Sequence, residues 1–308
     1  MSILLPTLVI GLLVFHTLER VLPPILPGYR TGPLRQGYLT DLTSALVNGP
    51  GLSGLTKLAA YGALQLVPAW GHTFSGWSWG AQFALFFIVD DFCRYWLHRW
   101  YHKFEWLWRI HRVHHTVTEM DSVSLLRIHV LEGAAKNFFI ALPFQTLGLD
   151  STVIAVYLAF DLIKGFWHHA NFKTYIGPLN YLFVSAELHW WHHAADGPGS
   201  RSNYGSKISL WDWLFGTAYW PRGQWPDVIG VREMEHFSHD YIRQFCSIWF
   251  DDRSLIERIR WRVAGVRSGD GPADSVAIAA PVNDVTDPGR ATPSAYGSTA
   301  APPSTTSV

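Results

Sequence analysis

Long apolar stretches recur through the first half of the chain, each interrupted or edged by a few charged residues. The stretches are residues 3–18, 42–67, 79–97, 130–149 and 151–167. Several of them reach or approach the roughly 20 residues that a helix needs to cross a bilayer. Because charges fall inside or beside them, some of these helices should be short or tilted. The pattern predicts an all-α fold, an integral membrane helical bundle with four or five membrane-embedded helices.

The ends of these stretches predict an orientation in the membrane. The first stretch has no basic segment before it and is followed by Glu19 and Arg20 rather than by the small residues of a cleavage site, so it predicts a retained anchor. If the helices alternate in direction, the segments on one side, 1–2, 69–76 and 147–150, contain no Lys or Arg. The positive-inside rule then places the opposite, histidine-rich segments in the cytoplasm. We expect a multi-pass membrane protein with a cytoplasmic histidine-rich helical catalytic region.

Composition agrees with a membrane protein. The chain has 308 residues, of which 48% are hydrophobic and 16% charged, against roughly 25% charged residues in typical soluble domains. Its 24 basic and 24 acidic residues cancel, which excludes a broadly basic nucleic-acid binder. Cys93 and Cys246 are too few for a disulfide scaffold and lack the paired spacing of a structural zinc site. The unusual feature that remains is the number of histidines, which is 15.

The chain divides by composition into four regions. We expect N-terminal membrane helices in residues 1–78 and a catalytic core, including membrane helices, in residues 79–220. A cytoplasmic helical extension should follow in residues 221–267. Residues 268–308 are rich in Gly, Pro, Ala, Ser and Thr, a composition that predicts a disordered tail.

Eight of the 15 histidines fall in three windows of five residues. The windows are His98-Arg-Trp-Tyr-His102, His111-Arg-Val-His114-His115 and His189-Trp-Trp-His192-His193. Positions i, i+3 and i+4 share one face of a helix, so each window directs at least two imidazoles the same way. Buried imidazoles without partners are costly, whereas a metal ion binds each one. The windows therefore predict metal ligands.

The number of histidines favours two metal ions. A structural zinc site closes with four ligands, often including Cys, and eight histidines without a usable Cys exceed that need. Haem iron takes only two axial histidines, usually one from each helix. Closely spaced histidine windows fit non-haem ions better.

Together with their surroundings, these windows resemble the histidine boxes of the fatty acid hydroxylase / sterol desaturase superfamily, integral-membrane di-metal oxygenases. The neighbouring motifs that strengthen the resemblance are Asp91–Tyr95, Leu107–Arg109, Leu126-Arg-Ile-His129 leading to Glu132, Asn203-Tyr-Gly205 and Trp211–Thr217. The resemblance covers about residues 80–220. It is specific for the superfamily and unspecific for the substrate.

The resemblance implies two non-haem iron ions and an enzyme that uses O2 to hydroxylate or desaturate an unactivated C–H bond of a lipid. The lipid would be a sterol, a fatty acyl group or a carotenoid. The sequence contains no flavin, nicotinamide or iron–sulfur motif, so electrons should come from an external donor, a ferredoxin or a small haem protein with its reductase. The implied partners are therefore the lipid substrate, O2, the membrane and this donor.

A further ligand is implied at the end of the last apolar stretch, which reads His168-His169-Ala-Asn171. Aligning the second histidine of the family's His-x3-His pair with His168 puts Lys164 where the first would stand, whereas a His-Ala-Asn pattern favours His169. Both histidines stay candidates. The candidate metal ligands are His98, His102, His111, His114, His115, His168, His169, His189, His192 and His193.

No catalytic residue is expected beyond the metal ligands, but six residues should support the ligands or line the substrate entrance. They are Asp91, Arg127, His129, Glu132, Asn203 and Asp212. Asp91 is expected to hold an imidazole through its second nitrogen, the usual role of a carboxylate near a metal. Its alternative is a helix-end charge close to Arg94 and Arg99. For His129 the alternative role is that of a metal ligand.

Three other functions compete with an oxygenase. A histidine-rich metal transporter should place its ligands near the middle of the membrane, whereas these windows lie at helix ends beside arginines. A zinc-dependent membrane hydrolase is disfavoured because neither a G-x-S-x-G nor an H-E-x-x-H motif is present. A bis-histidine haem electron carrier would differ by its Soret absorbance.

Overall fold

The computed structural model describes residues 3–29, 31–48, 52–66, 71–231 and 239–246, all within the compact unit formed by residues 1–254. The chain is helical over these ranges, and the β pairings found there are two isolated bridges, Phe183 with Ile208 and Ala194 with Ile229. The predicted all-α class is therefore confirmed. The predicted tail, residues 268–308, lies outside the described residues.

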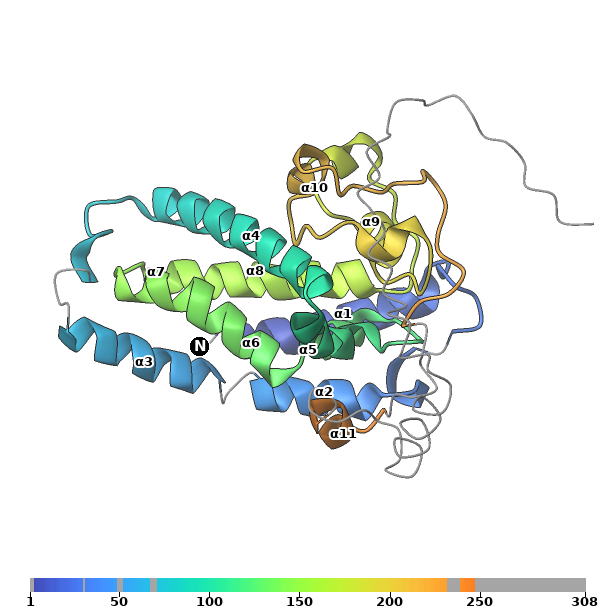
Figure 1. Cartoon of the computed structure of the whole chain (residues 1–308), viewed down its shortest axis with the longest axis horizontal. Coiled ribbons are helices and arrows are strands. Elements are labelled where there is room, and N and C mark those ends of the chain that lie inside the picture. Colours follow the sequence, from blue (N-terminus) through green and yellow to red (C-terminus); the bar gives the residue numbers. More distant parts are fainter. Residues whose placement is uncertain (1–2, 30, 49–51, 67–70, 232–238, 247–308) are drawn as a thin grey trace, which may run out of the picture. The chain divides into compact units, whose positions relative to one another are not determined.

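Eleven α-helices and several shorter turns follow one another in the described part of the chain (Figure 1). The α-helices are α1 (Leu4–Val21), α2 (Tyr38–Leu46), α3 (Leu52–Leu66), α4 (Trp79–Lys103), α5 (Glu105–His115), α6 (Val130–Lys136), α7 (Leu142–Thr146), α8 (Ser151–His169), α9 (Ala186–His192), α10 (Leu210–Leu214) and α11 (Tyr241–Cys246). The 3-10 turns are η1 (Gly32–Leu34), η4 (Ser122–Leu126), η6 (Gly177–Tyr181) and η7 (Pro198–Arg201), and η5 (Asn137–Ala141) is a π-helical turn.

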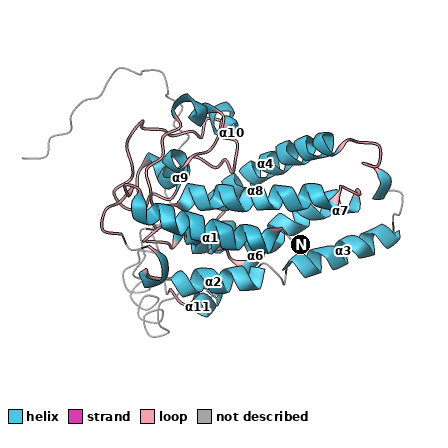
Figure 2. Cartoon of the chain, turned by 180° about the vertical axis from the view of Figure 1, so that it is seen from behind, coloured by secondary structure: helices cyan, strands magenta, loops and turns pink. Residues whose placement is uncertain are grey.

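The helix α8 lies between α4 and α1, as both views show (Figures 1 and 2). Gly11 permits the close approach of α1, because a Cβ atom at this position would lie 2.5 Å from the ring of Phe166 on α8. One turn further, Phe15 stacks on the same ring with centroids 5.7 Å apart. A larger residue at position 11 would push α1 away from α8.

Aromatic side chains join α8 to α4 and α7 near the start of α8. The ring of Phe86 meets Tyr157 and Phe144 edge-on, each with centroids 4.8 Å apart. Val153 and Phe74 complete this buried cluster. Such edge-to-face pairs add about 0.5–1.5 kcal/mol beyond the burial of their area. This end of α8 is therefore fixed by apolar packing, whereas its other end carries histidines.

Among the described helices, α1 alone is long and apolar enough to cross a membrane by length and composition. The predicted stretch 42–67 is divided between α2 and α3, and the stretch 130–149 is divided among α6, η5 and α7. Charged residues inside α4 and α8 lower their apolar character. The four or five membrane-embedded helices and the cytoplasmic position of the histidines stay predictions.

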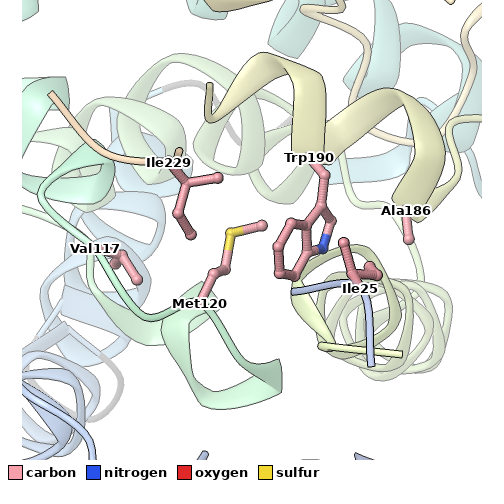
Figure 3. Packing of buried hydrophobic residues seen from close by; sticks show 6 residues of the cluster. All are labelled: Ile25, Val117, Met120, Ala186, Trp190 and Ile229. Atoms are coloured by element: carbon pink, nitrogen blue, oxygen red, sulfur yellow. The ribbon is translucent and has the colours of Figure 1, made fainter. Parts of the chain in front are cut away.

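A second buried cluster holds α9, the helix that carries the third histidine window. Ala186 and Trp190 lie one turn apart on α9 and pack against Ile25, Met120 and Val117, with Ile229 completing the cluster (Figure 3). Trp190 is fully buried. Segments distant in sequence therefore fix α9, which lies against the end of α8.

The predicted division at residues 78, 220 and 267 stays a prediction. Of the predicted helical extension, the structure describes residues 221–231, which contain no helix, and residues 239–246, which include α11. Residues 247–267 lie outside the described part of the chain.

Candidate metal centre

Nine histidines gather in two groups, each able to surround one cation. The first group consists of His98, His102, His111, His115 and His192. The second group consists of His114, His169, His189 and His193. Within each group, one ring nitrogen from every histidine lies within 4.8 Å of the corresponding nitrogens of the others.

Helix geometry divides the histidine windows between the two groups. On α5, His111 and His115 lie one turn apart and join the first group, whereas His114 turns toward the second. At the other window, His189 and His193 join the second group and His192 joins the first. Residues i and i+4 share a helix face, and the residue at i+3 is rotated away from i+4 by about 100°. A His-x2-His-His window on one helix can therefore serve two sites.

Acceptor oxygens fix the direction of five of these imidazoles. The five Nδ1 atoms donate to the backbone carbonyls of Tyr204 (from His98, 2.9 Å), Arg127 (from His114, 3.0 Å), Gly165 (from His169, 2.9 Å) and Ser202 (from His192, 2.8 Å), and to the carboxylate of Glu132 (from His111, 3.0 Å). Because these oxygens carry no hydrogen, each Nδ1 carries the proton of a neutral imidazole. The Nε2 lone pair then points into the group.

Burial keeps four of these imidazoles neutral, those of His98, His114, His169 and His192. Desolvation lowers the pKa of His192 to about 3 and that of His169 to about 4. It also holds the pKa of His98 and His114 well below the usual range, and neighbouring imidazoles lower both further. At neutral pH these side chains therefore offer lone pairs, the form in which histidine binds metals.

The contacts between Nε2 atoms fit a shared cation. The Nε2 atoms of His98 and His111 lie 3.0 Å apart, and those of His169 and His114 lie 3.3 Å apart. Both members of each pair have their proton on Nδ1, so two lone pairs face one another and no hydrogen bond forms. The Nε2 atom of His192 is likewise buried without a hydrogen-bond partner. A metal ion inside each group would satisfy all of these nitrogens at once.

Two of the predicted supporting residues contact histidines of the two groups. Glu132 is buried and places one carboxylate oxygen on His111 and the other 2.7 Å from the Lys136 ammonium. Arg127 acts through its backbone carbonyl, which accepts a hydrogen bond from Nδ1 of His114. Its guanidinium donates to the Gly37 carbonyl at 3.0 Å. Such contacts fix the tautomer and the ring orientation of a ligand.

Asn203 and Asp212 act one step further away. The Asp212 carboxylate accepts hydrogen bonds from the backbone N–H groups of Tyr204 (2.7 Å) and Gly205 (2.8 Å). These bonds hold the Tyr204 backbone in place, and the Tyr204 carbonyl accepts a hydrogen bond from Nδ1 of His98. Asn203 has a positive φ of 56°, and its amide donates to the Leu188 carbonyl of α9 at 2.8 Å.

Asp91 does not hold an imidazole, so this expectation is wrong. Its carboxylate accepts hydrogen bonds from the backbone N–H groups of Lys207 (2.8 Å) and Ile208 (3.1 Å) and from the indole of Trp211 (3.0 Å). It fixes the loop that follows the third window. The alternative, a helix-end charge close to Arg94 and Arg99, is met only in part. Asp91 lies in the middle of α4 and interacts with Arg94 electrostatically, and its ion pair among the described residues is a long contact with Lys207 at 3.9 Å.

His168 and His129 lie outside both groups. Nε2 of His168 donates to the Val184 carbonyl at 3.0 Å, because His168 is rotated by about 100° from His169 on α8. In His129, Nδ1 accepts from the Leu131 N–H at the start of α6 and Nε2 donates to the Phe245 carbonyl. Both nitrogens of His129 are therefore occupied by backbone groups, and it caps a helix.

A cavity of about 150 Å³ adjoins both groups. Histidines from each group line it, among them His98, His111 and His169. Its wall also carries five charged residues from α4, α6 and α8, namely Arg94, Glu132, Lys136, Asp161 and Lys164. Sequence reasoning expected Glu132 to support a ligand or line the substrate entrance, but it treated Lys136 and Asp161 only as charges inside or beside apolar stretches.

Comparison with known proteins confirms the resemblance to the superfamily. Residues 83–217 match the model of the family described as fatty acid hydroxylase. The chain is 30% identical over 155 residues to an ornithine lipid hydroxylase, OlsE, of Rhizobium tropici, a match covering 50% of this chain and 47% of the relative. It is 31% identical over 143 residues to the alkylglycerol monooxygenase of Homo sapiens, covering 46% of this chain and 31% of the relative.

A more distant relative is methylsterol monooxygenase 1-1 of Arabidopsis thaliana, 25% identical over 140 residues, which are 44% of this chain and 46% of the relative. The chain thus matches about half or less of the length of these curated relatives. No solved structure matches it.

Proposed function

We propose that this chain, which belongs to the fatty acid hydroxylase family over residues 83–217, is a membrane-bound oxidoreductase acting on a lipid. It would use O2 and external electrons to hydroxylate or desaturate an unactivated C–H bond. The observation that carries this proposal is the pair of histidine groups, with lone pairs facing one another, beside one shared cavity.

Each histidine group would hold one iron ion. When bound and reduced, the two irons supply the redox chemistry with dioxygen. The protein contributes the positions of the ligands, through Glu132 and the backbone carbonyls that orient the imidazoles. It also keeps most of the ligand side chains away from solvent, because the histidines of the second group and most of the first are buried.

A lipid substrate is supported by the relatives, which are named as an ornithine lipid hydroxylase, an alkylglycerol monooxygenase and a methylsterol monooxygenase. The apolar surface of α1 agrees with a membrane location, since Leu5 and Leu13 expose 67% and 66% of their surface. A sterol, a fatty acyl group and a carotenoid are all compatible with this evidence.

Electrons would reach the first group from outside the chain. The corner between α4 and α5 exposes Lys103 and Arg109 close to the first and second histidine windows. Trp108 follows this corner on α5, with its ring 5.0 Å from that of His102. Glu105 pairs with Arg109 here, and the net positive charge that Lys103 adds suits an acidic ferredoxin or a small haem protein served by a reductase.

Untargeted lipid analysis of cells with and without the full chain tests the proposal. We expect cells with the chain to contain a lipid that is oxidised relative to its precursor. Its mass should be about 16 units higher, for one added oxygen atom, or about 2 units lower, for two lost hydrogen atoms. Formation should require O2 and disappear in His98→Ala, which removes a ligand of the first group. Metal-replete protein that forms no oxidised lipid with a working electron donor would contradict the proposal. ATP-independent metal uptake into vesicles would favour a transporter instead.

A further inference from the structure

Lys164 places an amine beside the second histidine group. It lies on α8 and lines the cavity with His169 and His189. Its ammonium donates to the Val184 carbonyl and lies 4.0 Å from the centre of the Trp167 ring. A carbonyl accepts one of the three ammonium hydrogens, so Lys164 keeps donor capacity for a molecule in the cavity.

The other charged groups of the cavity wall have ionic partners. Nζ of Lys136 lies 2.7 Å from Glu132, and Nε of Arg94 lies 2.6 Å from Asp90. Asp161 is 2.7 Å from the Lys207 ammonium. Among the described residues, Lys164 has no carboxylate within ion-pair distance. Asp91 interacts with it electrostatically from beyond that distance, so Lys164 lacks the close ion pair that Lys136 and Arg94 have.

The size of the cavity limits what reaches the histidines. A space of about 150 Å³ accommodates a group of roughly the size of a benzene ring, so only one end of a lipid can enter it. A hydrocarbon end would displace water from the ammonium and from the paired charges without replacing its hydrogen bonds. An anionic or carbonyl group would accept the remaining N–H bonds of Lys164.

We propose that Lys164 is a specificity-determining residue that binds an anionic or carbonyl group of the lipid beside the second histidine group. The polar end of the lipid, rather than its hydrocarbon tail, is then presented to the metals. This inference rests on the proposed function and narrows it, because oxidation would fall on a carbon close to that polar group.

Equilibrium binding of three radiolabelled probes, each with a chain of about 16 carbons, tests this assignment: palmitate, methyl palmitate and hexadecane. The full-length, metal-loaded protein is used without reductant, so that no turnover occurs. We expect palmitate to bind at least about tenfold more tightly than hexadecane, which corresponds to 1.4 kcal/mol or more. Methyl palmitate should fall between them, because it offers a carbonyl without the charge.

Variants separate charge recognition from a structural role. Lys164→Met should abolish the preference for palmitate, and Lys164→Gln should lower palmitate binding while keeping that of methyl palmitate. Lys164→Arg should retain the preference. The matched control is Lys173→Met, an exposed lysine outside the cavity, which should bind like the wild type. Metal content is measured for every variant, and Lys164→Gln serves if Lys164→Met fails to fold.

Equal binding of palmitate and hexadecane by the wild type would overturn the assignment. A preference for palmitate that survives in metal-replete Lys164→Gln and Lys164→Met would overturn it as well. These outcomes are independent of catalysis, since no product is formed in the assay. A protein that binds palmitate through Lys164 but oxidises no lipid would refute the proposed function and leave this binding site standing.

Discussion

One carboxylate oxygen of Glu132 lies 3.0 Å from Nδ1 of His111, although the two residues come from different helices. Both side chains are buried. The carboxylate accepts the Nδ1 hydrogen and thereby directs Nε2 of His111 into the first histidine group. The other oxygen is neutralised by Lys136. Glu132 belongs to neither histidine group, yet this contact fixes the tautomer of His111.

Glu132→Gln should weaken metal binding in the first group. The glutamine amide can still accept a hydrogen bond from His111, but without the negative charge that raises the basicity of the imidazole. We expect a loss of about 10–100-fold in metal affinity, measured by competition with a chelator. Glu105→Gln is the matched control, because Glu105 pairs with Arg109 on the exposed side of α5. Equal metal affinities for both variants would exclude an orienting role for Glu132.

Each histidine group should bind one metal ion, and a substitution in one group should remove the metal from that group alone. His192→Ala removes a nitrogen from the first group, and His193→Ala removes one from the second. Each variant should retain about one of the two metal equivalents. A transition-metal site uses about four or five ligands, and each substitution removes one ligand from one group only. Elemental analysis of gently purified protein measures this. A wild-type maximum of one equivalent with full activity would disprove the dinuclear arrangement.

His169, and not His168, should supply the ligand from α8. His169 belongs to the second group, whereas His168 donates to the Val184 carbonyl. His169→Ala should therefore lower the metal content by up to one equivalent, and His168→Ala should leave it near the wild-type value. The comparison is made by elemental analysis after the same purification. The reverse order of effects would move the ligand to His168.

The sequence predicted which histidines gather but not how they divide. Spacing and family resemblance pointed to the three windows, yet only the folded helices show that His114 turns away from His111 and His115. The orienting groups on Tyr204 and Ser202 are backbone carbonyls, which every residue carries, so no side-chain pattern reveals them. Asp91 was misjudged for a related reason, since its partners are backbone N–H groups of a distant loop.

Helix boundaries were predicted less well than helix content. Apolar composition indicated one segment over residues 130–149, but the structure inserts the π-helical turn η5 between α6 and α7. Charges within apolar stretches were treated as defects of membrane helices. Arg94 and Asp161 instead pair with one another at 3.4 Å in the wall of the cavity beside the histidine groups. Such pairing depends on contacts between helices, which hydropathy along one segment does not contain.

Removal of residues 268–308 should leave metal content and turnover unchanged. This segment contains no histidine, and its low content of large apolar residues cannot offset the entropy of ordering the chain. The truncated and full-length proteins should be compared in the same membranes, with equal expression verified. A large loss of turnover at unchanged expression would show that the segment contributes to the catalytic unit.

Asp212→Ala should impair metal retention although Asp212 contacts no imidazole. Its carboxylate accepts hydrogen bonds from the N–H groups of Tyr204 and Gly205 and from the Thr217 hydroxyl. Alanine would leave the two buried N–H groups unpaired, at a cost of about 1–3 kcal/mol for each unsatisfied group, whereas the Thr217 hydroxyl keeps its contact with Tyr95. The Tyr204 peptide would then be free to rotate, and its carbonyl would no longer hold Nδ1 of His98.

We therefore expect Asp212→Ala to lose metal from the first group and to retain it in the second. Asp212→Asn keeps one oxygen acceptor and should lose less metal than the alanine variant. Asp227→Ala, at an exposed position outside the loop, controls for the removal of a carboxylate. If Asp212→Ala retains two equivalents and full turnover, His98 is held by the rest of the fold, and the bracing role of Asp212 is refuted.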